Sequence, residues 1–482
     1  MRARGTFRQP SMHNAWYRFA KRKPTGGTVS TSKHIGFDIA FAIISVVFLI
    51  VGIFASPLFN VPDEESHFCR AYQVSEGCLV SYADPNDPTN GLMGGVLPTA
   101  VAVPDELART HTHADVADYA TRAIDNSDRS FVSFRNTALY SPVSYTPQAL
   151  GIAIARLLTG NVATLAYAGR FMNWLAAVAI IFLCLRFLPT GKPIAFALAL
   201  LPMMQQELFS LATDGISFAL CLAIVTCALY WREQNGTMGL RHLALIAAIV
   251  LALSQFKIVY VPICLALFLI PVERFGGKAR YVCSVACIAA LGIAGCLGWL
   301  SISSNILAHE ALGTGVDPDA QMAFVKTNPF AVVAAMARTF AVNLPFYLES
   351  STADYLAWMG IRVNPLIVIL YLLVLAAATI SGTEPLKRPF TLRTRLALAG
   401  IALLICALIY ASLYLQYTPV GSSMVGGTQG RYFIPLYLLI MLACMSNKNL
   451  LPAKLGSPLR WLPPASLILD LATGFTAIAH VM

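Results

Sequence analysis

Charged residues are scarce in this sequence. Only 12% of its 482 residues are Asp, Glu, Lys or Arg, whereas 57% are hydrophobic. Soluble globular domains carry about 25% charged residues, so an ordinary soluble protein is excluded. Several stretches of close to 20 residues hold no charge, and about 20 residues is the length at which an α-helix crosses a bilayer. The composition therefore predicts an all-α integral membrane protein with many spans.

The sequence also lacks the short motifs of several enzyme and metal-binding classes. Its eleven cysteines include no CxxC pair and no zinc-ligand spacing. Walker A, a GxGxxG in a strand–helix setting and a catalytic triad are likewise missing. The net charge of +10 does not indicate nucleic-acid binding, because the basic residues are scattered over short loops. We expect them to contact membrane lipids instead.

Acids are absent from residues 1–36, where eight basic residues lie. By contrast, residues 60–139 hold twelve of the 24 acids, five Arg and no Lys. This asymmetry across the first apolar stretch predicts a cytoplasmic N-terminus and an extracytoplasmic loop at 60–139. We expect residues 1–36 to be a disordered cytoplasmic tail, and the acidic loop to be long enough to carry its own small structure.

Residues 37–482 are expected to form one polytopic membrane domain with about eleven spans. Residues 140–158 begin with a polar segment and should form a re-entrant or interfacial helix. Residues 301–362 should form a second extracytoplasmic loop, in which 329–344 is a surface helix and not a span. The expected spans are 37–59, 161–185, 193–209, 214–231, 242–256, 257–271, 281–300, 363–381, 396–416, one that starts at 431, and 463–481.

The stretch after the first span has the signature of a helix start. Pro62 suits the first helical position, and the three acids at 63–65 suit the first turn, near the positive end of the helix dipole. At helical spacing Asp63, His67 and Arg70 share one face. Ordinary helix capping explains these residues about as well as chemistry does, so the stretch alone leaves both interpretations open.

Two cysteines differ from the others because they lie in the acidic loop. Cys69 and Cys78 could form a disulfide if the loop faces an oxidising exterior. Two unpaired thiols are the alternative. The remaining cysteines lie mostly in apolar stretches, where they are expected to pack as small hydrophobic residues.

The predicted topology gathers costly ionisable residues at the extracytoplasmic ends of spans. Ionisable groups near membrane depth usually serve function. Carboxylates beside cations suit a site that binds an anionic headgroup and takes a proton from an acceptor. Apart from the residues after the first span, the group consists of Asp214, Lys257 and Arg431 with its neighbour Tyr432.

Residues 61–77, VPDEESHFCRAYQVSEG, resemble the opening motif of a bacterial family of predicted membrane proteins, the domain of unknown function 2142. The resemblance extends over about 37–446. That family in turn is similar to the GT-C superfamily of integral-membrane glycosyltransferases, which use polyprenyl-phosphate-linked sugars and carry an acidic motif after their first span. Later blocks that agree in order are 140–158, Ser210–Asp214, Phe256–Lys257, Leu356–Met359 and Gln429–Pro435.

The resemblance implies a GT-C-like enzyme in the bacterial cytoplasmic membrane. It would transfer a sugar from a polyprenyl-phosphate donor to a cell-envelope glycan or lipid acceptor at the outer face. Asp63 would be the general base, and Glu64 or His67 would orient that base or the acceptor. Arg431 and Lys257 would hold the donor phosphate.

Other roles and functions stay open at this point. Arg70, Asp214 and Tyr432 complete the expected substrate-binding residues. Asp63, Glu64 and Asp214 are candidate oxygen ligands of a divalent cation such as Mg²⁺ or Mn²⁺, although the sequence does not decide metal use. A transporter or flippase of a lipid-linked sugar or an anion is one alternative, although no inverted repeat is visible. A non-catalytic subunit of an envelope-synthesis complex is another.

Overall fold

The computed structural model describes residues 35–86, 92–107, 109, 111–158, 160–307, 315–381, 388–447, 450 and 457–482. The predicted tail, residues 1–36, lies outside these residues except at its last two positions. From Gly36 onward the chain forms one compact unit.

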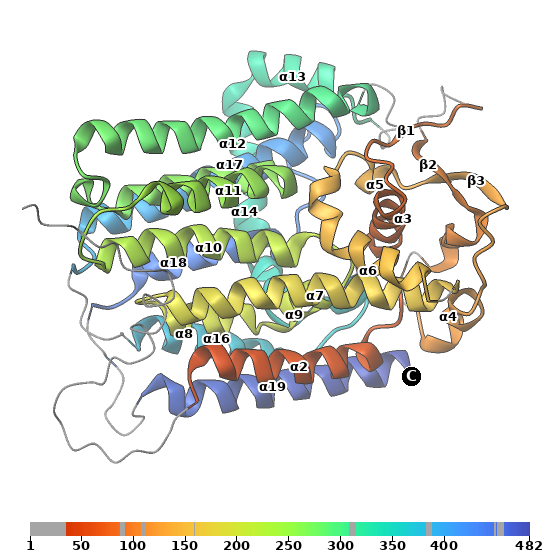
Figure 1. The fold of residues 1–482 in the computed structure, drawn as a ribbon, viewed down its shortest axis with the longest axis horizontal. Helices are drawn as coiled ribbons and strands as arrows, with labels where there is room; N and C mark the ends of the chain where they lie inside the picture. The colour runs from red at the N-terminus through yellow and green to blue at the C-terminus, as the bar shows by residue number, and fades with distance from the viewer. Residues whose placement is uncertain are drawn as a thin grey trace, which may run out of the picture. The chain divides into compact units, whose positions relative to one another are not determined.

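Long apolar helices make up most of this unit. Within the described residues, seven helices are long and apolar enough to cross a membrane. They are α2 (Phe37–Ala55), α7 (Val162–Phe187), α10 (Asp214–Glu233), α12 (Lys278–Leu307), α14 (Pro329–Thr352), α17 (Leu392–Gln416) and α19 (Pro458–Val481). Figure 1 shows α2, α7, α10, α12 and α19 with their axes roughly parallel to one another. The predicted all-α membrane class is confirmed.

Shorter apolar elements account for the other expected spans. Proline explains two of their irregularities. The expected span 193–209 is broken because Leu201 precedes Pro202 and adopts an extended backbone. The residues after Lys257 form a 3₁₀ helix with Pro262 inside it, and proline has no N–H for helical bonding. The elements at these spans are α8 (Lys192–Ala199), α9 (Pro202–Phe209), α11 (Leu240–Phe256), η4 (Ile258–Leu269), α16 (Pro365–Ile380), η6 (Gly430–Phe433) and α18 (Ile434–Cys444). A short 3₁₀ helix, η5 (Val272–Phe275), follows η4.

Helix α14 is longer than the sequence predicted. The expected surface helix at 329–344 extends to Thr352 and reaches 24 residues, a length and composition sufficient for a span. It packs against α9, η6, α16 and α13 (Pro318–Thr327). Figure 1 shows α14 running crosswise to the parallel helices. A short helix, α15 (Leu356–Met359), follows it.

The acidic loop after α2 folds into a small α/β structure. Helix α3 (Glu64–Ser75) packs against β2 of a three-stranded antiparallel sheet with strand order β1-β2-β3. Gly94 allows β2 to approach β3, since a Cβ there would lie 1.9 Å from the carbonyl oxygen of Val132. The other elements are β1 (Tyr82–Ala83), β2 (Met93–Pro98), β3 (Arg129–Ser133), η1 (Thr99–Val101), η2 (Asp105–Leu107), α4 (His113–Ala120) and α5 (Arg135–Ala138).

The segment expected as a re-entrant or interfacial helix joins this loop structure to the spanning helices. It consists of η3 (Pro142–Tyr145) and α6 (Thr146–Arg156). Helix α6 packs on both α3 and α7. The start of α3 is thereby fixed against the ends of the spanning helices, and the ionisable residues lie there.

Candidate functional site

Asp63 stands at the N-terminus of α3 in an unusual backbone conformation. Its φ is 61°, in the left-handed region that few residues other than glycine, Asn and Asp adopt. The Asn136 side-chain amide donates to Oδ1 at 2.9 Å. The Asp63 side chain is 27% exposed, and its Oδ2 lies 3.8 Å from Nη2 of Arg431. The structure therefore holds this carboxylate in a defined position while leaving part of it accessible.

Arg431 lies behind Asp63 and binds a second carboxylate. Its Nη1 donates to Oε1 of Glu207 at 3.0 Å, and both of these side chains are almost fully buried. In the described part of the chain, Oε2 of Glu207 has no hydrogen-bond partner. Gly430 allows η6 to approach α14, because a Cβ there would lie 2.4 Å from Oγ of Ser350. This close approach fixes the position of the guanidinium.

A second cation lies beside the first. The Lys257 ammonium is 2.5 Å from Oδ1 of Asp214, the first residue of α10, and both side chains are largely buried. The Lys257 Nζ is 4.9 Å from the centroid of the Tyr432 ring, and the Arg431 guanidinium is 5.5 Å from the same centroid. The two ion pairs thus share one aromatic ring, which joins them into one cluster.

His67 borders this cluster from α3. Its Nδ1 is 2.7 Å from the hydroxyl of Tyr145, and its ring stacks on that of Tyr140 at a centroid distance of 6.0 Å. Burial is the main cause that lowers the pKa of His67 to about 3, and the nearby charges of Arg431 and Lys257 lower it further. The imidazole is therefore neutral at physiological pH.

Glu64 lies outside this cluster. It is fully buried, and its Oε1 accepts from Nε of Arg170 at 2.8 Å and from the Leu211 N–H at 3.0 Å. Its Oε2 accepts from Nη2 of Arg170 at 2.5 Å and from the Phe59 N–H at 3.0 Å. With four donors on one carboxylate, Glu64 ties α3 to α7 and has no oxygen left to orient a base or an acceptor.

Arg70 also differs from its predicted place in the site. Its Nη1 donates to Gln73, and its Nη2 donates to the carbonyl oxygens of Leu79 at 2.7 Å and Tyr140 at 3.0 Å. Burial lowers the pKa of Arg70 to about 10. The guanidinium therefore stabilises the loop structure through carbonyl and amide oxygens and joins no ion pair of the cluster.

The structure does not contain the expected disulfide. Cys69 and Cys78 are both free thiols. Cys69 is buried on the side of α3 that packs against η1, and its Sγ lies 3.6 Å from the carbonyl oxygen of Val101. The Sγ of Cys78 lies 3.6 Å from the carbonyl oxygen of Val80. The open alternative of two unpaired thiols is the one that the structure adopts.

The three candidate metal ligands do not converge. Glu64 is saturated by Arg170 and backbone amides, and Asp214 is paired with Lys257. Only Asp63 retains an exposed carboxylate edge. No group of three His, Cys, Asp or Glu side chains among the described residues is arranged to hold a metal ion. These three carboxylates therefore do not form a shared metal site in this structure.

Two charged residues of the site region were missed by the sequence analysis. Glu207 lies in the apolar stretch 193–209 and Arg170 in the stretch 161–185, each as an isolated charge. A charge inside an apolar helix is rarely left unpaired, and that rule could have predicted a partner for each. Which partner each one takes depends on the packing of α3, α7, α9 and η6.

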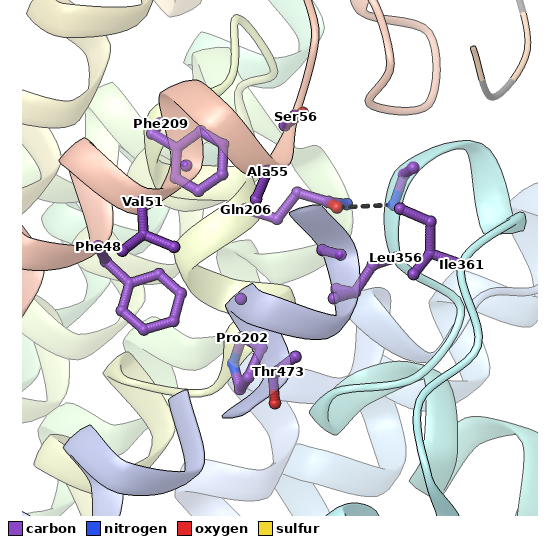
Figure 2. Close-up of a pocket in the computed structure, with 14 residues that line it drawn as sticks. Phe48, Val51, Ala55, Ser56, Pro202, Gln206, Phe209, Leu356, Ile361 and Thr473 are labelled. Atoms are coloured by element: carbon purple, nitrogen blue, oxygen red, sulfur yellow. Dashed lines mark hydrogen bonds between the residues drawn. The ribbon is translucent and has the colours of Figure 1, made fainter. Parts of the chain in front are cut away.

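Two hollows lie near the site. One, of about 240 Å³, lies between α3, β3 and the segment 102–105 and is lined by Glu65, Ser66, Cys69 and Asp105 among others. Burial raises the pKa of Glu65 to about 8. The other, of about 30 Å³, is lined mainly by apolar residues of α2, α9 and α19. Figure 2 shows Gln206 at its edge, hydrogen-bonded to the α15 backbone.

These features define a multi-pass membrane protein with a cluster of ion pairs at one end of its helices. The chain belongs to the family described as predicted membrane protein (DUF2142), whose model matches residues 46–440. This confirms the family that the opening motif predicted. Helix α19 lies beyond the matched region. Comparison with curated proteins and with solved structures gives no match.

Proposed function

We propose that this protein is a membrane glycosyltransferase of GT-C type. It transfers a sugar from a polyprenyl-phosphate donor to a cell-envelope glycan or lipid acceptor, at the outer face of the bacterial cytoplasmic membrane. The N-terminus is then cytoplasmic, and α3 with its sheet lies outside. The observation that carries the proposal is the position of Asp63, a partly exposed carboxylate in front of two buried cations.

Asp63 is suited to act as the general base. A base must accept the proton of the acceptor hydroxyl as that oxygen attacks the anomeric carbon. One Asp63 oxygen is held by Asn136 and the other is 3.8 Å from Arg431, a separation too long for a hydrogen bond. This second oxygen is therefore available to a hydroxyl, and the left-handed backbone at Asp63 sets its direction.

Arg431 and Lys257 are suited to bind the donor phosphate. A guanidinium can contact a phosphate through two N–H groups, whereas an ammonium acts as a point charge. Both would also stabilise the negative charge that develops on the leaving phosphate. Tyr432, which lies against both cations, fixes their spacing.

His67 is suited to hold neighbouring elements in place, and it is not suited to transfer a proton. Burial lowers the pKa of His67 to about 3, so the imidazole of the free protein is neutral. Its contact with the Tyr145 hydroxyl connects α3 to η3. We assign Glu64 no catalytic role, because all of its hydrogen-bond contacts are internal.

The test is transfer of labelled sugar from polyprenyl-phosphate donors to envelope polysaccharide, in membranes that carry wild-type protein or Asp63→Asn. A general base contributes about 10²–10⁴-fold, so we expect a loss in that range at equal protein levels. Asp118→Asn, an exposed acid on α4, is the matched control and should keep full activity. Full transfer by Asp63→Asn would exclude Asp63 as the base.

The orientation is tested separately with topology reporters. A reporter fused after Ala100, in the sheet region, should report outside, and one fused after Phe390, between α16 and α17, should report inside. The reasons are the acids in residues 60–139 and the four basic residues in 387–395. Both reporters on one side would contradict the orientation and the outward-facing site.

One observation favours a transporter or flippase as the second candidate. Asp470 is fully buried in the middle of α19, and the Tyr371 hydroxyl donates to it. A carboxyl at mid-span is common where ions or protons cross a membrane. If the protein is a transporter, Asp470→Asn would abolish transport. Neither Asp470→Asn nor Asp63→Asn would then form a glycosidic product. A non-catalytic subunit would show neither activity.

A further inference from the structure

The charged cluster contains more acids than bases. Its cations are Arg431 and Lys257, and its carboxylates are Glu207, Asp214 and Asp63. Two positive and three negative groups leave a net charge of −1 when all are ionised. His67 adds nothing, because its imidazole is neutral, and Glu64 and Arg170 cancel each other at a separate place.

A phosphate diester would therefore meet two cations whose charge Glu207 and Asp214 already balance, with the partly exposed Asp63 as a further negative charge. Adding one more negative charge beside these carboxylates is unfavourable, since an uncompensated charge in a low-dielectric interior is costly. The two cations cannot compensate alone, because each already binds a carboxylate: Arg431 at 3.0 Å and Lys257 at 2.5 Å. Some other positive charge must enter with the donor.

We infer that the donor phosphate binds together with one proton, and that Glu207 is the group that takes this proton. The inference rests on the proposed function, since it assumes a phosphate-linked donor. The balance is simple: the diester brings one negative charge, the proton brings one positive charge, and no bond to the sugar changes in this step. Protonated Glu207 then releases Arg431 to bind the phosphate.

The geometry distinguishes Glu207 from the other two acids. Asp214 is held by the closer ion pair, with Lys257, and Asp63 is 27% exposed, so water stabilises its charge. Glu207 is fully buried, and its Oε2 has no hydrogen-bond partner among the described residues, which leaves room for a proton. The charged groups that act on Glu207 are Arg431, Asp214 and Lys257.

The experiment measures the affinity of the purified full-length protein for a short isoprenyl phosphodiester as a function of pH, with a chelator present. A phosphodiester keeps one negative charge throughout the range, so any pH dependence belongs to the protein. We expect wild-type affinity to fall about tenfold for each pH unit above the pKa of Glu207 in the free protein. In Glu207→Gln the affinity should not change with pH and should equal that of wild type at low pH.

Two further variants make the result decisive. Glu207→Asp keeps a titratable group and should keep the slope, which provides a readout if Glu207→Gln does not fold. Asp118→Asn removes an exposed carboxyl outside the site and should leave the wild-type slope unchanged.

The outcomes separate the two proposals. Binding with a flat pH profile in wild type, a slope that persists in Glu207→Gln, or binding that requires added Mg²⁺ would overturn the inference and leave the donor site standing. No binding at any pH would overturn the phosphate-donor site and the inference with it.

Discussion

Asp63 and Glu64 are neighbours in the sequence and opposites in the structure. The Glu64 carboxylate is fully buried and accepts four hydrogen bonds, two of them from Arg170. The Asp63 carboxylate accepts one hydrogen bond, is partly exposed, and shares Arg431 with Glu207. Two adjacent residues thus belong to different arrangements: Glu64 to an ion pair with all its hydrogen bonds made, and Asp63 to a cluster in which some are not.

The difference shows how to read buried charges in a membrane protein. A saturated pair fixes two elements relative to each other and can bind nothing else. A cluster with shared cations and an unpaired oxygen keeps the capacity to accept a ligand or a proton, as perturbed groups at functional sites do. Substitutions at the two places should therefore affect different measurements.

The largest effect on folding is expected from Glu64→Gln. The change leaves the Arg170 guanidinium buried without a counter-charge, and breaking a buried pair on one side costs about 3–5 kcal/mol. We expect a loss of that size in the free energy of unfolding in detergent, with much less folded protein in membranes. The double variant Glu64→Leu with Arg170→Met removes both charges and should recover part of the loss. A Glu64→Gln protein as stable as wild type would contradict the structural role of this pair.

Arg431→Gln should act on both stability and binding. It leaves Glu207 buried without its cation, so that Glu207 takes up a proton, and a buried neutral polar group left unsatisfied costs about 1–3 kcal/mol. Donor binding should weaken strongly, because the phosphate loses a charged hydrogen-bond donor. The measurements are unfolding in detergent and affinity for the isoprenyl phosphodiester. Unchanged affinity would remove Arg431 from the donor site.

Glu65→Gln should change how stability depends on pH. The pKa of Glu65 is raised from 4.5 to about 8 by burial, so the unfolded chain loses this proton at lower pH than the folded protein does. The contribution of Glu65 to stability therefore falls as pH rises from about 4.5 to about 8 and levels off above that. Glu65→Gln should remove this fall, whereas Glu106→Gln, an exposed acid of the same loop, should retain it. Identical pH profiles of stability in wild type and Glu65→Gln would contradict the shift.

The smallest effect on folding is expected from Asp63→Asn. Asparagine also tolerates the left-handed backbone, and the 3.8 Å contact to Arg431 is partly exposed, so the unfolding free energy should change by less than about 1 kcal/mol. The same unfolding assay as for Glu64→Gln provides the comparison. A loss as large as that of Glu64→Gln would mean that the two acids serve the same structural purpose.

Much of the architecture was predictable because it depends on local composition. Apolar stretches of sufficient length specify spanning helices. The sequence also indicated that Asp63, Asp214, Lys257 and Arg431 would meet, since each lies at the same end of its span. The break at Pro202 and the 3₁₀ helix containing Pro262 follow from proline chemistry, although the sequence analysis treated both stretches as continuous spans.

The partners of these charges were decided by the tertiary structure alone. Sequence spacing placed Asp63, Glu64, His67 and Arg70 on or near one face of a helix, and it could not separate their roles. Their partners come from distant elements: Arg170 from α7, Glu207 from α9, and carbonyl oxygens of the loop structure for Arg70. The candidate disulfide between Cys69 and Cys78 is likewise not formed, because α3 directs Cys69 into the core beside η1.

The sequence by itself determined that this chain is a multi-pass membrane protein and that its costly charges gather at one end of the helices. The length of each apolar stretch and the charge asymmetry of its flanks are local properties. They determine, one segment at a time, whether and in which orientation a helix crosses the bilayer. The tertiary structure decided which carboxylate is saturated and which stays available. That outcome depends on contacts of a few ångströms between residues more than a hundred positions apart, as for Glu64 and Arg170, and no local pattern encodes them.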